Sequence, residues 1–131
     1  MGNFEALVNA YMDAKTNYDT WHLKRQDLTH RRPETPLQFN SLAEADKFKV
    51  ILDDYEAGIE AMEREETDCV KQMAALGKQI LNLLKVKNAW VKAGDYAVGF
   101  YCDTWGGMHY ELEVRRWSED LPKLPDHTYY P

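Results

Sequence analysis

A cluster of cationic side chains lies just before the first proline of the chain. Its members are His22, Lys24, Arg25, His30, Arg31 and Arg32, interrupted only by Asp27. Cations near a helix C-terminus offset the helix dipole, and this role explains part of the cluster. Six such groups exceed what that role requires, and Pro33 stiffens the segment that carries Arg31 and Arg32. Guanidinium groups held in this way are suited to binding phosphates or carboxylates.

A second cluster, in the last third of the chain, is aromatic. It contains Trp90, Tyr96, Phe100, Tyr101, Trp105, Tyr110 and Trp117, with Arg115 and Arg116 adjacent. About half of these rings must pack in a core, but Trp105 lies in a glycine-rich turn where burial is harder. Tyr101 shares one strand face with Ala97 and Gly99, which predicts a shallow step beside its ring. Aromatic planes flanked by arginines suit a flat ring carrying a negative charge, or a protein-binding hot spot.

No catalytic or metal-binding signature accompanies these clusters. His109 and Glu111 match the HxE of zinc deaminases, but the partner P-C-x-x-C is missing. The polar strand face formed by His109, Glu111 and Glu113 is better explained by solvation than by a metal. Cys69 and Cys102 fall at apolar positions and are expected to be unreactive. We therefore expect a non-enzymatic protein without a metal or cofactor.

The charge distribution narrows the range of partners. The formal net charge is −6, which disfavours a general nucleic-acid-binding protein because neutralising phosphates needs a basic face. The acidity is concentrated in Asp53–Asp68, where eight carboxylates accompany a single basic residue, Arg64. Such a segment is either a solvated helix face or a contact surface for a basic partner.

Targeting signals are not visible in the sequence. The segment Met1–Ala6 has neither the basic nor the apolar region of a secretory signal, and no apolar run approaches the length needed to span a bilayer. The two cysteines make no CxxC motif. These features predict a reduced, cytoplasmic protein that does not interact with membranes.

Two long helices are predicted by seven-residue repeats. The first runs from about Asn3 to Arg31 and ends before Pro33, and its seam residues are Phe4, Tyr11, Tyr18 and Arg25 with Leu7, Ala14, Trp21 and Leu28. The second opens at Leu42 behind a capping box made by Ser41 and Glu44. Its repeat extends almost to Lys85 and places Glu66 and Cys69 on the seam. Gly58 and Gly77 are the two points at which this helix would be most easily bent.

The helices are expected to form an antiparallel hairpin. A hairpin centred on the connector places Phe4 opposite about Cys69 and leaves the last fifteen or so residues of the second helix without a helical partner. The β unit or a second subunit would have to cover that end. The charged seam residues Arg25 and Glu66 are predicted to set the register or contact another subunit. The uncovered end of the second helix and these charged seam residues together favour a homo-oligomer.

The remaining chain predicts a small antiparallel sheet. Strands near Trp90, over Tyr96–Cys102 and over Met108–Arg115 form a three-stranded meander from about 86 to 117, and the tail 118–131 is an extended strap that Tyr129 and Tyr130 could hold in place. The fold class is α+β, with a long antiparallel helical hairpin over about 3–85 followed by the meander, in a single domain 1–131.

These features favour a protein that captures an anionic, ring-containing small molecule at a subunit junction. The expected ligand-binding residues are Arg31, Arg32, Trp90, Phe100, Tyr101, Trp105, Arg115 and Arg116. A nucleotide derivative would fit this chemistry, and the layout is similar in outline to phage proteins that sequester nucleotide immune signals, an analogy of architecture. The alternative is a protein-interaction or inhibitor module that acts through the acidic helix face.

Overall fold

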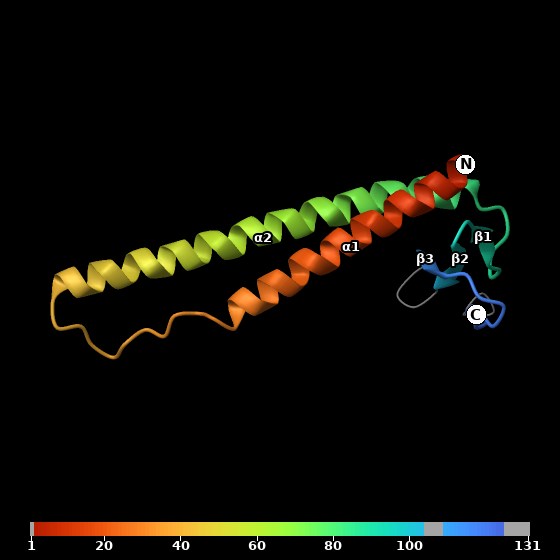
Figure 1. The fold of residues 1–131 in the computed structure, drawn as a ribbon. Helices are drawn as coiled ribbons and strands as arrows, with labels where there is room; N and C mark the ends of the chain where they lie inside the picture. The colour runs from red at the N-terminus through yellow and green to blue at the C-terminus, as the bar shows by residue number, and fades with distance from the viewer. Residues whose placement is uncertain (1, 104–108, 125–131) are drawn as a thin grey trace. The chain divides into compact units, whose positions relative to one another are not determined.

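The computed structural model describes residues 2–103 and 109–124 and confirms the α+β fold class. Helix α1 (Asn3–Thr29) and helix α2 (Leu42–Leu83) are followed by strands β1 (Val91–Ala93), β2 (Tyr96–Asp103) and β3 (His109–Arg116), in the order seen in Figure 1. The start of the predicted third strand, Met108, and the predicted turn residue Trp105 lie outside the described residues.

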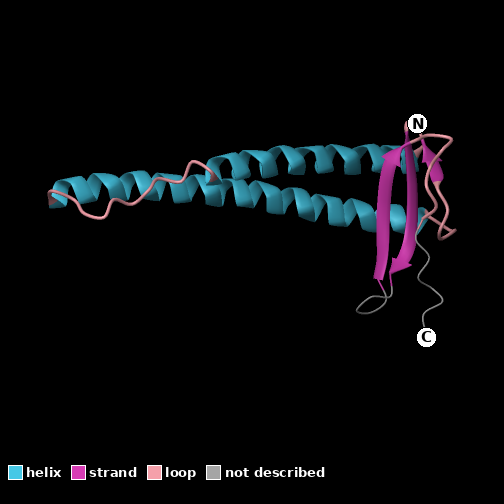
Figure 2. Ribbon diagram, turned by 90° about the horizontal axis from the view of Figure 1, so that it is seen from below, coloured by secondary structure: helices cyan, strands magenta, loops and turns pink. Residues whose placement is uncertain are grey.

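Helix α1 ends two residues earlier than predicted. After Thr29 the chain tightens, and the Arg31 and Arg32 amides donate to the carbonyls of Leu28 and Thr29, three residues back, at 3.0 and 3.4 Å. Bonds of this spacing commonly close the last turn of a helix. Arg31 and Arg32 therefore belong to the turn that leaves the helix, which continues into the connector drawn in pink in Figure 2.

Helix α2 begins with the predicted cap. The Glu44 amide donates to the Ser41 hydroxyl at 3.2 Å, and the Asn40 amide donates to the Glu44 carboxylate at 3.1 Å. The carboxylate thus reaches one residue further back than in the usual capping box. The helix is continuous through Gly58 and Gly77. A Cβ at Gly58 would lie 3.2 Å from the Leu28 side chain, which indicates that α1 approaches closely there.

The three strands form the predicted antiparallel meander in the order β1-β2-β3 (Figure 2). Val91 pairs with Val98, and Phe100 pairs with Leu112. Gly94 forms the turn between β1 and β2 with a φ of 61°, a conformation that glycine adopts without strain. The Trp117 amide donates to the Asp95 carbonyl at 2.9 Å and extends the β2–β3 pairing beyond Arg116.

The chain divides into two compact units. The first consists of Met1–Ala14 with Gln72–Pro131, and the second is Lys15–Lys71. Each unit therefore contains one stretch of α1 and one stretch of α2, and the sheet belongs entirely to the first unit.

The core of the first unit lies between its helices and the sheet. Its buried side chains are Val8, Ile80, Leu84, Ala93, Val98 and Phe100. Leu112 and Val114 of β3 pack against this cluster, as the predicted alternation of β3 requires. The sheet therefore covers the start of α1 and the end of α2 together.

The predicted helix pairing was wrong by about two heptads. In the first unit Phe4 lies beside Leu83 and Leu84 rather than opposite Cys69, and Tyr11 lies near Gly77. The end of α2 consequently has a helical partner. The stretch without one is the start of α2, where Leu42, Val50 and Ile51 are exposed. The physical reason is that the connector lies against the start of α2, where the Phe39 and Phe48 ring centres are 5.6 Å apart, so that α1 pairs further along α2.

The outer face of the sheet, opposite the helices, is covered in part by the strap. Leu124 is 3% exposed, and a Cβ built at Gly99 would lie 2.5 Å from its side chain. The Trp90 indole also donates to the Pro122 carbonyl at 2.7 Å. The strap is therefore held by Leu124 and Trp90, and Leu124 occupies the shallow step that was predicted beside Tyr101. Tyr129 and Tyr130 lie outside the described residues.

Neither described helix contains a stretch apolar enough to cross a bilayer.

Candidate ligand-binding site

The two predicted binding arginines lie in the second unit and face carboxylates. The Arg31 guanidinium lies 3.1 Å from Asp27 in an exposed pair. Arg32 lines a hollow with Arg25 and Thr29 from α1 and Tyr55, Glu56, Ile59, Glu60 and Glu63 from α2. Three glutamates around this hollow oppose an anionic ligand, because like charges repel at short range.

Arg25 and Glu66 form an ion pair within the second unit. The Arg25 Nε donates to Glu66 Oε1 at 2.7 Å, and His22 Nδ1 lies 3.6 Å from the same oxygen. Glu66 is 8% exposed, and its hydrogen bond is the main cause that raises the pKa of Arg25 above its usual value. The pair bridges α1 and α2 at their seam, which fits the predicted role in setting the register.

Of the predicted aromatic and arginine residues of the β unit, Arg115 and Trp90 lie against each other. Arg115 lies 2.6 Å from Glu113, and its guanidinium stands 6.0 Å from the centre of the Trp90 ring. Arg116 is exposed at the end of β3, and Tyr101 is half-buried. Phe100 points to the opposite side of the sheet from Tyr101, since neighbouring strand residues alternate. Trp105 lies outside the described residues.

Phe100 contributes instead to a hollow that we name the cationic groove, of about 510 Å³. It is lined by Lys78, Leu81, Asn82, Leu84, Lys85, Lys87 and Phe100. Lys78, Leu81 and Asn82 belong to α2. Leu84, Lys85 and Lys87 follow the end of α2, and Phe100 belongs to β2. Three lysines and three apolar residues line the groove, and among the described residues no carboxylate lines it.

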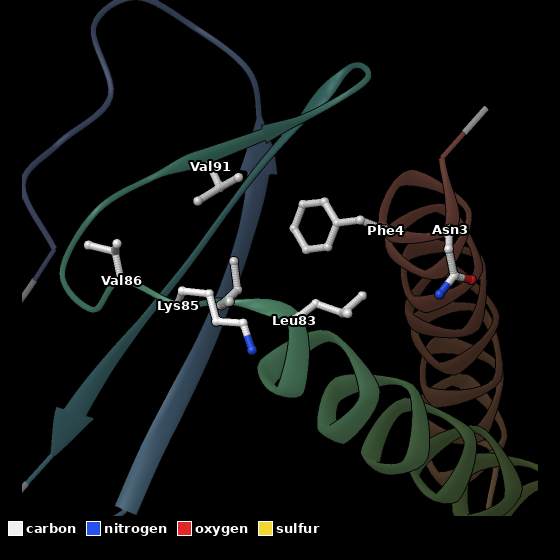
Figure 3. A pocket seen from close by; sticks show the side chains of 7 residues that line it. Asn3, Phe4, Leu83, Lys85, Val86 and Val91 are labelled. Carbon is white, nitrogen blue, oxygen red and sulfur yellow. The ribbon is translucent and has the colours of Figure 1, made fainter.

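A second hollow adjoins the cationic groove, and we name it the apolar hollow. It measures about 470 Å³ and is lined by Asn3, Phe4, Leu83, Leu84, Lys85, Val86 and Val91. Figure 3 shows the Phe4 ring pointing towards Val91, with Leu83 nearby and the Lys85 amine turned towards α2. That amine lies 3.5 Å from the Asn82 carbonyl, and Asn82 belongs to the cationic groove.

The sequence signal for the cationic groove is a lysine-rich segment, which is separate from the predicted arginine and aromatic clusters. Between Asp68 and Asp95 there is no carboxylate, although five lysines occur there: Lys71, Lys78, Lys85, Lys87 and Lys92. Lys71, Lys78 and Lys85 are seven residues apart, which places them along one side of a helix. In a chain of net charge −6, this is the longest segment without an aspartate or glutamate, so it is the segment that repels an anion least.

Cys69 is buried, as its seam position predicted, with 7% of its surface exposed. Burial, followed by the nearby Glu65 and Asp68, raises the pKa of its thiol. We therefore expect native protein at pH 7 to react with a maleimide at Cys69 far more slowly than unfolded protein, because the thiolate is the reactive form. Mass spectrometry of digested samples measures this, and rapid native labelling at Cys69 would contradict the seam assignment.

The described side chains include no group of three or more histidine, cysteine, aspartate or glutamate residues placed to hold a metal ion. No protein-family model matches the chain, and the curated proteins and the solved structures gave no significant match.

Proposed function

We propose that this chain is a non-enzymatic binding protein that takes an anionic, ring-containing small molecule in the cationic groove. The observation that carries the proposal is that Lys78, Lys85 and Lys87 line one hollow together with apolar residues, without a carboxylate among the described lining residues. Two hollows of the second unit differ in this respect, because Glu56, Glu60 and Glu63 line one of them and Glu60, Glu63 and Asp68 line the other.

The groove's chemistry favours an acidic group attached to an apolar or aromatic body. An ammonium group binds phosphate, carboxylate or sulfonate as a point charge, without the fixed geometry that a guanidinium imposes. Leu81, Leu84 and the edge of Phe100 offer apolar contact beside those charges. A nucleotide derivative belongs to this ligand class. The same proposal includes a site at a subunit junction, in which Arg31 and Arg32 of a second copy complete the cationic groove.

The test is a fluorescence titration with 8-anilinonaphthalene-1-sulfonate (ANS), a ring-containing anion whose emission rises on binding. A Lys78→Glu/Lys87→Glu chain should bind ANS roughly 10- to 100-fold more weakly, since each exposed ion pair that is lost contributes up to about 1 kcal/mol and each reversed charge also repels the sulfonate. The uncharged analogue N-phenyl-1-naphthylamine should bind both chains within about twofold, because it makes no ion pair.

A matched control is Lys47→Glu, which changes the net charge at an exposed position of α2 in the second unit. It should bind ANS like the parent. Equal ANS affinity in the parent and the Lys78→Glu/Lys87→Glu chain, with both folded by circular dichroism, would reject the cationic groove as the site.

The alternative function, an interaction module acting through its acidic face, has one supporting observation. Glu60, Glu63 and Asp68 line a shared hollow on α2, so their charges are gathered on one surface of the second unit. Binding of this kind would survive the lysine substitutions. It would be lost on reversal of Glu60 and Glu63, and it would weaken strongly with salt.

A further inference from the structure

The cationic groove and the apolar hollow share a wall. Leu84 and Lys85 line both, so the two hollows are adjacent beside the end of α2. Each volume lies within the range of about 300–1,000 Å³ that is typical of small-molecule sites. Two adjacent hollows of different lining are what a ligand with two chemically different parts would need.

The apolar hollow accepts an apolar body better than a polar heterocycle. Five of its seven lining residues are hydrophobic, and the polar side chains are Asn3 and Lys85. A nucleobase placed there would leave several donors and acceptors without partners, and unsatisfied polar groups are costly. Leu83 and Val86 are 43% and 60% exposed, so an apolar body would remove their surface from water.

We propose that the ligand is an amphipathic organic anion, with its apolar body in the apolar hollow and its acidic group held by Lys85 and the lysines of the cationic groove. This rests on the proposed function for the acidic group, and it replaces the ring of that proposal by any apolar body, because a polar ring such as a nucleobase does not fit. The shared chemistry covers both an alkyl chain and a fused aromatic system next to a carboxylate, sulfonate or phosphate.

The test is displacement of ANS by three classes of competitor at equal concentration. Alkane-1-sulfonates of six, eight and ten carbons should displace it with an affinity that rises roughly threefold per methylene, the gain expected when each methylene is buried. Naphthalene-2-sulfonate should compete as an aromatic member of the class. Adenosine monophosphate should displace little, because its base does not fit the hollow.

The variant Val86→Glu separates the two hollows, since Val86 lines only the apolar one. Its exposed position means that the fold should survive, and Leu83→Glu is a second variant if it does not. Binding of ANS and of uncharged N-phenyl-1-naphthylamine should both weaken about tenfold or more, because a carboxylate enters the space of the apolar body. The lysine variant should weaken ANS alone.

The outcomes distinguish the two proposals. If the lysine variant weakens ANS while Val86→Glu and chain length have no effect, the apolar body is elsewhere; this inference fails and the proposed function stands. If Val86→Glu weakens both probes and the lysine variant neither, the acidic group is not held in the groove, and both fail. Displacement by adenosine monophosphate as strong as by the decyl sulfonate overturns the narrowing to apolar bodies.

Discussion

A chain carrying Ile80→Ala should unfold with a free energy about 2–5 kcal/mol below that of the parent. Ile80 is fully buried between the helices and the sheet of the first unit, in contact with the cluster that contains Val8, Leu84 and Val98. Removing three carbons there loses their transfer from water and leaves a cavity that the surrounding elements fill only in part. Urea denaturation followed by circular dichroism measures the change.

The neighbouring Leu83→Ala is the matched control, because it removes a similar volume from the same turn of α2. Leu83 is 43% exposed, so its loss should lower the free energy of unfolding by only about 1 kcal/mol. Equal losses for the two substitutions would mean that the sheet does not cover the side of α2 that carries Ile80.

The elements of this fold were predictable because their signals are local. Ser41 and Glu44 lie within one helical turn, and the Glu44 amide donates the hydrogen bond to the Ser41 hydroxyl that opens α2. The alternation along β3 likewise placed Leu112 and Val114 towards the helices. Signals of this kind depend on residues that are neighbours in sequence, and they need no knowledge of the rest of the chain.

The pairing of the helices was not predictable from the seam repeat alone. Phe4 was expected opposite Cys69 and lies beside Leu83, fourteen residues further along. A slip of two heptads returns every seam residue to the seam, so the apolar repeat fits both pairings almost equally well. What distinguishes them is long-range: the length of the connector, the Arg25–Glu66 pair and the sheet that covers Ile80.

The contents of the hollows were also outside the reach of local patterns. Ala97 and Gly99 predicted a step beside Tyr101, but Leu124, which fills it, lies 25 residues beyond Gly99 in the sequence. The arginines were predicted to bind an anion because guanidinium groups bind anions well. In the structure Arg31 and Arg115 each face a carboxylate. The lysines of the cationic groove were detectable as a segment without acidic residues, and only the fold brings Lys87 and Phe100 to the same hollow.

The pair formed by Arg25 and Glu66 should be a main determinant of the register in the second unit. We expect Glu66→Arg to lower the melting temperature by roughly 10 °C, because it places two cations together at a buried seam position and removes the carboxylate that Arg25 contacts. Thermal unfolding followed by circular dichroism measures this. The loss should persist at high salt, since a charge at 8% exposure is screened weakly.

The exchanged chain, Arg25→Glu/Glu66→Arg, decides whether the loss comes from this contact. It restores opposite charges across the seam and should recover most of the melting temperature, whereas Arg25→Glu alone should not, because two carboxylates would then face each other. A single Glu66→Arg chain that melts with the parent would show that the pair contributes nothing to the register. The choice between two pairings of the same repeat would then depend on the connector and the sheet alone.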